Sequence, residues 1–502
     1  MAAAGKAYQA RNYAEAERLY SSALQEADQP DSSDPRLVTS LNNLAELYRE
    51  RGKYAEAEPL FERSLQLCEK ARGPNHLDLV PVLTNLASLY RQMGRYPEAE
   101  SLLRRALEIR ESGYPGGDSR IAAGLAALGE LYRSEGRFAE AEKYLKLVLE
   151  MDQKAAPNTA AVAAPLSNLA ELYRAMNRYA EAESLYLKAI AVQEAALGPN
   201  HPDLAVTLND LAELYRNEAK YSAAEPLYKR SLEIREKSFS PGDPRITTAI
   251  NNLGLLRETQ GLYTDAELHF RRVLTLREVA LGPNHPDLAT PLNNLAELYG
   301  HQGKFSDAEK LYKRALQIRE TAYGPEHPDV ATSLVNLALL KQARKQYKDA
   351  TALQQRALAI REKIFGPDHP VIASSLSNLG ELSFTRRNYA EAQAFYARAL
   401  AIREKALGPE HRAVALSLQN LADLYRAEGR YSEAEPLYLR ALAIREKILG
   451  KYHPDVAAAL EGYAKLMRET GRPTKAEDLE ERARQIRAAS PQSVAKTGNP
   501  YT

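Results

Sequence analysis

The chain has 502 residues, of which 44% are hydrophobic and 26% are charged. Its 67 Lys and Arg residues nearly balance its 66 Asp and Glu residues, so the net charge is +1 at pH 7. This balance argues against a protein that binds nucleic acids or anionic membranes, because such proteins usually carry a basic patch or stripe. The single cysteine, Cys68, allows no intrachain disulfide and no cysteine-based metal cluster. We interpret it as a buried helix residue.

The start of the chain reads MAAAGKAYQARNYAEAE, which contains no apolar signal-peptide segment. No apolar run elsewhere approaches the roughly 20 residues that a membrane-spanning helix needs. We therefore expect a cytoplasmic protein. The first repeat described below is incomplete, so either a shortened cap is present or the chain begins inside a longer one.

One pattern then recurs along the chain. The stretch NLAELYR begins at Asn43 and returns unchanged at Asn168. Equivalent residues are 42 positions apart, with one interval of 41, and we call them anchors: Asn43, Asn85, Ala127, Asn168, Asp210, Asn252, Asn294, Asn336, Asn378, Asn420 and Gly462. Residues 12–17 match residues 53–58 and mark a partial earlier repeat. We infer about twelve repeats, the first of them shortened.

Each repeat contains two helical periodicities. Apolar and small residues at i, i+3, i+4 and i+7 form one face of a helix, as in Leu208, Leu211, Ala212, Tyr215 and again in Tyr221, Ala224, Tyr228, Ser231. Most copies place Gly between the two helices, where it suits the left-handed conformation that ends a helix. Between repeats the sequence is GPNHPD or a close variant. In the copy at residues 198–203, Pro202 lies in the first turn of a helix and Asp203 follows it.

No segment alternates like a strand, so the sequence predicts an all-α fold. Two antiparallel helices per repeat would stack into a right-handed α-solenoid, or superhelix, over residues 1–488. The charged helix at 475–487 would cap the stack, and residues 489–502 read as a disordered tail. Prolines inside the second helices (Pro59, Pro226, Pro436) and the first helices (Pro81, Pro165, Pro291) predict local kinks without loss of helix.

The arrangement of Leu208, Leu211-Ala212, Tyr215, a turn, Tyr221, Ala224 and Tyr228 resembles the tetratricopeptide repeat. A 42-residue unit with the HPDLA…LNNLAELYR pattern is similar to the kinesin light chain type, over about residues 5–488. That resemblance implies a protein-binding array whose first helices line a concave groove. In such arrays, Asn at the anchor position contacts the backbone of a bound peptide. The heptad coiled coil of a kinesin light chain is not found in this chain, which looks like a repeat array alone.

Catalysis is not indicated. Seven of the nine His residues lie in or near linkers, at most one per repeat and at intervals of 42 or its multiples except across the 41-residue repeat, so no two need share a metal. We interpret them as residues that pack against or cap the helix start. The sequence contains no Walker loop, GxSxG elbow or HExxH motif. We expect no enzymatic activity, no metal and no cofactor.

The polar residues of NLAELYR point to binding. On a helical wheel, Asp210 and Glu213 both lie about 150° from the core direction, and Arg216 flanks them. Glu and Arg at i, i+3 would pair, but Asn is a mediocre helix former and needs another reason. Its amide both donates and accepts, so a row of Asn could hold a peptide backbone. Alternatively, Asn could bond to a neighbouring helix and fix the spacing of repeats.

The pattern breaks at Leu255 and Leu339, which replace Glu and could anchor an apolar group of a ligand. The predicted peptide-binding groove therefore comprises Asn43, Asn85, Asn168, Asp210, Asn252, Asn294, Asn336, Asn378, Asn420, Glu171, Glu213, Arg174, Arg216, Leu255 and Leu339.

We predict a non-catalytic scaffold that binds a peptide segment of a partner protein, with no membrane, nucleic-acid or small-molecule partner. The alternative function is an RNA-binding helical repeat, which the near-zero net charge and the row of Glu residues oppose.

Overall fold

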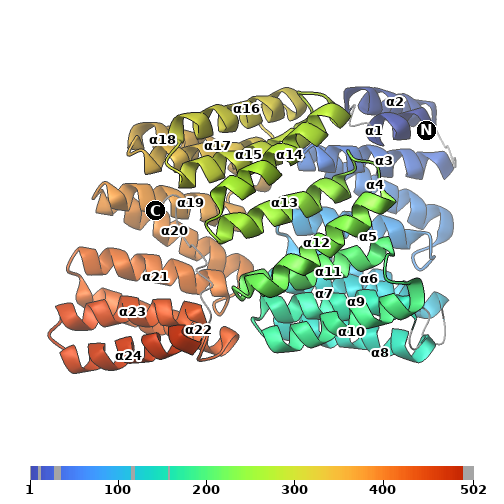
Figure 1. Ribbon diagram of the computed structural model, residues 1–502. Helices are drawn as coiled ribbons and strands as arrows, with labels where there is room; N and C mark the ends of the chain where they lie inside the picture. The colour runs from blue at the N-terminus through green and yellow to red at the C-terminus, as the bar shows by residue number, and fades with distance from the viewer. Residues whose placement is uncertain (1, 10–12, 28–34, 115–118, 157–158, 490–502) are drawn as a thin grey trace. The chain divides into compact units, whose positions relative to one another are not determined.

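The computed structural model describes residues 2–9, 13–27, 35–114, 119–156 and 159–489 (Figure 1). These residues form 24 α-helices and two 3₁₀ helices, and they contain no strand, which confirms the all-α prediction. Odd-numbered helices are the first helices of successive repeats and even-numbered helices are the second. Thus α11 (Pro202–Asn217) and α12 (Tyr221–Ser238) form repeat 6, and the described residues contain twelve such pairs.

The first helices of the other repeats are α1 (Ala2–Gln9), α3 (Pro35–Glu50), α5 (Leu79–Gln92), α7 (Ser119–Glu135), α9 (Ala163–Ala175), α13 (Pro244–Thr259), α15 (Ala289–His301), α17 (Pro328–Ala343), α19 (Pro370–Thr385), α21 (Arg412–Ala427) and α23 (Pro454–Glu469). The second helices are α2 (Tyr13–Ala27), α4 (Tyr54–Arg72), α6 (Tyr96–Gly113), α8 (Phe138–Ala155), α10 (Tyr179–Leu197), α14 (Tyr263–Leu281), α16 (Phe305–Tyr323), α18 (Tyr347–Phe365), α20 (Tyr389–Leu407), α22 (Tyr431–Leu449) and α24 (Pro473–Ala489). The 3₁₀ helices are η1 (Ala160–Val162) and η2 (Pro286–Leu288).

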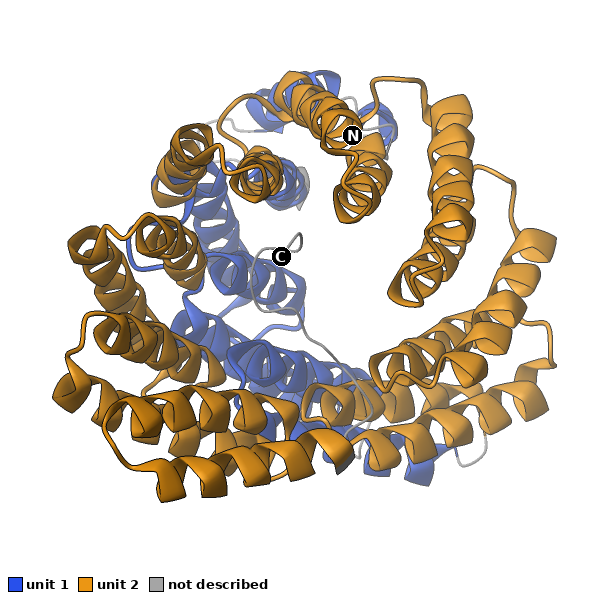
Figure 2. Cartoon of the chain, turned by 60° about the vertical axis from the view of Figure 1, so that its left-hand side comes forward, with its two compact units in different colours: residues 1–157, 363–369 blue, residues 158–362, 370–502 orange. Residues whose placement is uncertain are grey.

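The chain divides into two compact units, which Figure 2 colours separately. Compact unit 1 comprises residues 1–157 and 363–369, and therefore holds repeats 1 to 4. Compact unit 2 comprises residues 158–362 and 370–502, and holds repeats 5 to 12 apart from the end of α18. In each, helices that follow one another in the chain pack together.

The hydrophobic core is shared between repeats. One cluster joins Ala212 of α11, Tyr228 of α12 and Leu253 of α13, so it spans repeats 6 and 7. A second joins Phe270 of α14 with Leu295 of α15, and so spans repeats 7 and 8. A helix pair alone would leave these side chains in water, which is why the repeat must be copied to fold.

The turns follow the predicted chemistry. Gly52 and Gly303, between the helices of their repeats, have φ of 67° and 73°, the left-handed region in which Gly carries no steric penalty. Ala219 occupies the same turn in repeat 6 with φ of 58°. A side chain in this conformation costs roughly 1–2 kcal/mol, so the stacking of helices imposes the turn even where the sequence does not favour it.

The prolines act in two ways. Pro59, Pro226 and Pro436 lie inside α4, α12 and α22, which remain continuous helices as predicted. In first helices, Pro291 delays the start of the α-helix: α15 begins at Ala289, after the 3₁₀ helix η2. Pro165 does the same after η1. The reason is that proline removes a donor and its ring clashes with the carbonyl four residues earlier, which the tighter 3₁₀ turn avoids.

The ends of the array have short or charged helices. The first helix, α1, has only eight residues, and α24 covers the helix predicted at 475–487. The predicted tail at 489–502 lies outside the described residues, apart from Ala489 at the end of α24. Cys68 is buried in α4, as predicted, and burial raises the pKa of its thiol.

Candidate binding face on the first helices

The seven-residue stretch places two kinds of side chain on each first helix. In α11 the buried residues are Leu211, Ala212 and Leu214, and the partly exposed ones are Asp210, Glu213, Tyr215 and Arg216. The buried residues fit neighbouring helices. The partly exposed residues form the candidate binding face, and their contacts decide which of them are available to a ligand.

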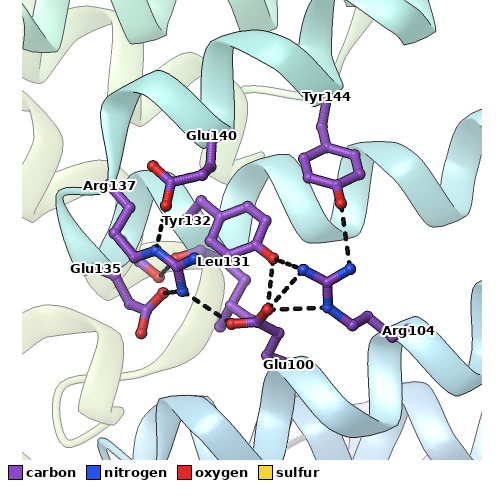
Figure 3. A network of polar contacts seen from close by, with 9 residues as sticks. Glu100, Arg104, Leu131, Tyr132, Glu135, Arg137, Glu140 and Tyr144 are labelled. Carbon is purple, nitrogen blue, oxygen red and sulfur yellow. Dashed lines mark hydrogen bonds and ion pairs between the residues drawn. The ribbon is translucent and has the colours of Figure 1, made fainter.

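In several repeats, the Tyr of the stretch links its repeat to the one before it. In repeat 4, the Tyr132 hydroxyl donates to Glu100 Oε1 of α6 at 2.7 Å (Figure 3). Arg137 Nη1 donates to Glu100 Oε2 at 2.8 Å, and its guanidinium lies 4.3 Å from the centre of the Tyr132 ring. Burial raises the pKa of Glu100, but the hydrogen bonds from Tyr132, Arg104 and Arg137 outweigh it and hold this pKa below its usual value.

The same link recurs with substitutions that preserve it. Tyr215 donates to Glu183 and Tyr299 to Glu267, each at 2.7 Å. In repeat 12, where Met467 stands at the Tyr position, Tyr463 from elsewhere on the same helix donates to Glu435 at 2.7 Å. Where Tyr is replaced, Lys341 bonds to Glu309 at 2.9 Å. Sequence reasoning assigned this Tyr to the core alone. The missed signal was the Glu that recurs near the start of the second helix, together with a basic residue five positions after the Tyr.

The Glu and Arg of the stretch pair with each other, as the i, i+3 spacing predicts. Arg174 Nε donates to Glu171 Oε2 at 2.8 Å, and Arg216 Nε donates to Glu213 Oε2 at 3.2 Å. The second helix adds a partner, since the Tyr228 hydroxyl donates to Glu213 Oε2 at 2.9 Å. Glu213 therefore holds the two helices of repeat 6 together as well as facing solvent.

Two anchor asparagines bond between repeats. Asn252 Nδ2 donates to Asn209 Oδ1 at 2.6 Å, and Asn294 Nδ2 donates to Asn251 Oδ1 at 2.6 Å. Each bond runs from an anchor to the residue that precedes the anchor of the previous repeat. We call such a bond a rung. At these two positions the structure has the inter-repeat bonding that the sequence left open as an alternative.

The other anchor asparagines make no such bond. Within the described residues, hydrogen bonds to protein are absent for the side chains of Asn43, Asn85, Asn168, Asn336, Asn378 and Asn420. Asn168 is exposed and the others are partly exposed. Six amides on equivalent positions of the first helices are thus available to a ligand.

Asp210 is a carboxylate in a row of amides. Burial raises its pKa to about 6, and the Asn209 amide opposes this shift with a hydrogen bond of 3.5 Å. Among the nearby cations, Arg174 is paired with Glu171, and Arg235 Nη1 donates to the Arg245 carbonyl at 2.9 Å. Asp210 is consequently the anchor whose charge responds to mildly acidic pH.

Leu255 and Leu339 lie in different surroundings. Leu255 packs against the cluster that contains Phe270, fifteen residues later. Glu213 and Tyr228 have the same spacing, so Leu255 and Phe270 replace a hydrogen-bonded pair by an apolar one. In repeat 9 the residue fifteen positions after Leu339 is Gln354, which stands where repeat 6 has Tyr228. The side chain of Gln354 is fully buried, and within the described chain neither its Nε2 nor its Oε1 has a hydrogen-bond partner.

Six of the seven linker histidines accept a capping hydrogen bond, as predicted, and the seventh, His369, lies with its Nε2 at 3.1 Å from the Gln92 carbonyl. His201 Nδ1 accepts from the Asp203 backbone N–H at 3.3 Å, and His453 Nδ1 accepts from the Asp455 N–H at 2.9 Å. The same bond is made by His76, His285, His327 and His411. Asp243 replaces His in repeat 7 and accepts from the Arg245 N–H at 2.8 Å. An accepting Nδ1 requires neutral imidazole, protonated on Nε2.

His453 predicts a pH dependence of stability. Burial lowers its pKa, with Arg412 and Arg445 adding to the shift and Asp455 opposing it. Because the folded-state pKa lies below the unfolded value of about 6.5, this contribution to stability is complete above that pH and is lost as the pH falls through the folded pKa. We expect the thermal midpoint to fall between pH 7.5 and pH 5.5.

The substitution His453→Asn keeps a cap acceptor but cannot titrate in this range. In scanning calorimetry its thermal midpoint should fall less over the same pH interval than that of the wild-type chain. An equal fall in both proteins would contradict the assignment to His453.

Buried arginines on the second helices bond to the next repeat. Arg319 Nη1 donates to the Asp329 carbonyl at 3.1 Å and to Ser333 Oγ at 2.9 Å. Arg445 Nη1 donates to the Asp455 carbonyl at 2.9 Å, and Arg403 Nη1 donates to Ser417 Oγ at 2.5 Å. Burial lowers the pKa of Arg403 to about 10. These guanidiniums are positive charges beside the first turn of the following first helix.

The described part of the chain brings no three His, Cys, Asp or Glu side chains together in a way that would hold a metal ion. Within the same residues, no helix combines the length and apolar character that a membrane crossing requires.

Comparison with known proteins places this geometry in a family. The chain is similar to a crystal structure of a putative kinesin light chain with nearly identical TPR-like repeats from Podosopora anserina, with 29% identity and a TM-score of 0.36, over 41% of this chain and 97% of that one. It is similar to BtubC (BKLC) from P. vanneervenii, with 24% identity and a TM-score of 0.37, over 49% and 92%. A Rap protein complexed with competence and sporulation factor has 15% identity and a TM-score of 0.42, over 74% and 98%.

A comparison with curated proteins returned no match. The model of the tetratricopeptide repeat matches nine overlapping segments: residues 1–63, 36–112, 83–154, 161–237, 245–321, 292–363, 329–405, 371–447 and 417–489. Together with paired helices and a core shared between repeats, this coverage of nearly the whole chain shows that the protein belongs to the tetratricopeptide repeat family.

Proposed function

We propose that this protein-interaction scaffold binds an extended peptide segment of a partner protein along the first-helix face that carries the anchors, and that it acts without catalysis. The observation that carries the proposal is the set of anchor amides that have no hydrogen-bond partner in the part of the chain that the structure describes. Asn336, Asn378 and Asn420 follow one another in repeats 9 to 11, and their side chains make no hydrogen bond within the described residues.

An amide row suits a peptide backbone for a chemical reason. Each Asn side chain offers two N–H donors and one carbonyl acceptor, which match the carbonyl and N–H of a peptide bond whatever its side chains. One such bond contributes about 0.5–1.5 kcal/mol, so several are needed for useful affinity. Anchors one repeat apart present amides at regular intervals, and an extended segment can contact several of them.

Charged and apolar neighbours would select the sequence of the segment. The paired Glu171–Arg174 and Glu213–Arg216 keep part of their surface exposed and favour a ligand with complementary charges. Leu255 and Leu339 are partly exposed on the same face and can contact an apolar residue. Asp210 favours a cationic group, which would lower its raised pKa.

The experiment begins with peptides selected on the full chain from a library of random dodecapeptides. Replacing Asn336, Asn378 and Asn420 together by Ala should weaken their binding about tenfold or more, since three hydrogen bonds of this kind are lost. Affinity is read by fluorescence anisotropy, and the thermal midpoint should change little because these side chains have no partner in the folded protein.

The matched control is the pair Asn252→Ala and Asn294→Ala, which removes the two rungs. It should lower the thermal midpoint, because a partly buried acceptor loses its donor at each position. The proposal fails if no peptide is selected, or if the triple variant binds as well as the wild-type chain. Binding of RNA oligonucleotides that falls steeply with salt would favour the alternative function instead.

A further inference from the structure

The series of rungs is interrupted between repeats 8 and 9. Asn252 and Asn294 complete the rungs to repeats 6 and 7, each at 2.6 Å. The next rung would run from Asn336 of α17 to Asn293 of α15. Asn293 is only 9% exposed, yet its Oδ1 has no hydrogen-bond partner. The side chain of Asn336, the anchor that should supply the donor, makes no hydrogen bond within the described chain.

The same junction contains a second buried group without partners. Gln354 of α18 takes the place of Tyr228 of repeat 6, and neither polar atom of its fully buried amide is bonded. Leu339, at the position of Glu213, removes the carboxylate that pairs with the Tyr elsewhere. Buried polar groups without partners destabilise a fold, so each one in a native protein calls for an explanation, and two of them lie at this junction.

A rung is also missing between repeats 2 and 3, but there it is not combined with a buried amide at the position that Gln354 occupies in repeat 9. Asn42 Oδ1 also has no partner, and Asn85 of the next repeat does not bond to it. However, Asn42 is less buried, and its Nδ2 donates to Ser64 Oγ at 2.7 Å and to the Val38 carbonyl at 3.0 Å. At the Glu position the following repeat has Ser88, which offers no apolar contact. A third acceptor, Gln419 Oε1 of repeat 11, also has no partner, but the anchor of the following repeat is Gly462, which has no side chain to donate. The junction of repeats 8 and 9 therefore differs from both.

We infer that the junction of α15 and α17 is the primary docking point of the peptide, and that the ligand completes the missing rung. This inference rests on the proposed function and specifies where it occurs. When a peptide binds, Asn336 donates one N–H to Asn293 Oδ1. Its second N–H and its Oδ1 then bond to the carbonyl and N–H of the peptide backbone.

The chemistry of the ligand follows from the neighbours of Asn336. Val335 replaces the polar residue that precedes most anchors, and Leu339 lies one helical turn after it, so both border Asn336 with apolar surface. The segment that fits is an extended peptide with an aliphatic or aromatic residue next to the amide that Asn336 holds. A polar segment would place its polar groups against Val335 and Leu339, whose side chains offer no hydrogen bond.

The test introduces at the junction the hydrogen-bonded Glu–Tyr pair that Glu213 and Tyr228 form in repeat 6. The double substitution Leu339→Glu and Gln354→Tyr recreates the Glu213–Tyr228 arrangement in repeat 9. It should raise the thermal midpoint, because a buried amide without partners is replaced by a bonded hydroxyl. The same variant should bind the selected dodecapeptides about tenfold more weakly. A merely structural role of these residues would change stability without changing affinity.

Two further variants make the result decisive. Phe61→Tyr is the control. Glu46 and Phe61 of repeat 2 stand at the positions of Glu213 and Tyr228, so this variant adds the same hydroxyl at a place far along the chain from the junction. It should leave peptide affinity unchanged. Asn336→Ala tests the junction without disturbing packing, and should weaken binding more than Asn378→Ala or Asn420→Ala.

The outcomes separate the location from the function. If peptides bind the wild-type chain but Leu339→Glu/Gln354→Tyr and Asn336→Ala leave their affinity unchanged, the junction is not the docking point, while the proposed function stands. If Phe61→Tyr weakens binding as much as the junction variant, the effect is not local and the inference is overturned. If no peptide is selected at all, the proposed function and the inference fall together.

Discussion

The substitution Tyr228→Ala should destabilise the array by about 3–5 kcal/mol, the range found when a buried aromatic side chain is truncated to Ala. The Tyr228 ring is fully buried and packs in the cluster that joins α11, α12 and α13. Its loss removes apolar contacts in both repeat 6 and repeat 7. In thermal unfolding followed by circular dichroism, the variant should melt well below the wild-type chain.

A companion variant separates the ring from its hydroxyl. Tyr228→Phe keeps the ring and loses only the 2.9 Å bond to Glu213, which Arg216 continues to contact. It should cost about 0.5–1.5 kcal/mol. Phe270 occupies the equivalent position in repeat 7 and shows that the ring alone can fill the site. A loss with Phe as large as that with Ala would contradict the assignment of the effect to packing.

Gly254→Ala should destabilise the chain, although Ala is the better helix former. A Cβ added at Gly254 would lie 2.6 Å from Phe270 Cε1 and 2.8 Å from Cδ1. Phe270 is fully buried and its ring has little freedom to move. Overpacking of this kind costs about 1–3 kcal/mol, which exceeds the gain in helix propensity of about 1 kcal/mol. Urea unfolding should show a lower midpoint.

The reciprocal change supplies the control. Ala212 stands at the equivalent position of repeat 6 and packs in the cluster that contains Tyr228. Ala212→Gly should therefore also destabilise, by about 1 kcal/mol through helix propensity and further through the loss of a buried methyl group. If Gly254→Ala instead stabilised the chain, the α13–α14 contact would have room for a methyl group. Gly380 provides a second case, because its added Cβ would lie 2.6 Å from Tyr396 Cε1.

Much of the local structure could be predicted because it depends on short-range chemistry. The spacing of Leu208, Leu211 and Ala212 fixed the helical face, and the Gly and Pro residues marked the turns. The His caps followed from their place before a helix start, and the structure confirms them. What spacing did not predict was the delayed start of α15, because that depends on how Pro291 competes with one particular carbonyl.

The candidate site was predictable only in part. The helical wheel put the anchor row and the Glu–Arg pairs on one face, and the pairs are present. It could not tell which amides are already bonded, because a rung needs two side chains from different repeats to meet at hydrogen-bond distance. Nor could it reveal the role of Tyr132, whose partner Glu100 lies 32 residues earlier.

The sequence by itself determined that this protein is an all-α array of tetratricopeptide repeats, because a pattern copied every 42 residues allows each helix pair to bury its apolar face only against the next copy. The tertiary structure decided which polar residues hold that array together and which remain available. Asn252 and Asn294 are the same residue type as Asn336 at the same position of the repeat, but within the described residues Asn252 and Asn294 reach an acceptor in the preceding repeat and Asn336 does not. The physical reason is that a hydrogen bond tolerates only a few tenths of an ångström, whereas the repeat pattern specifies no more than the face of a helix.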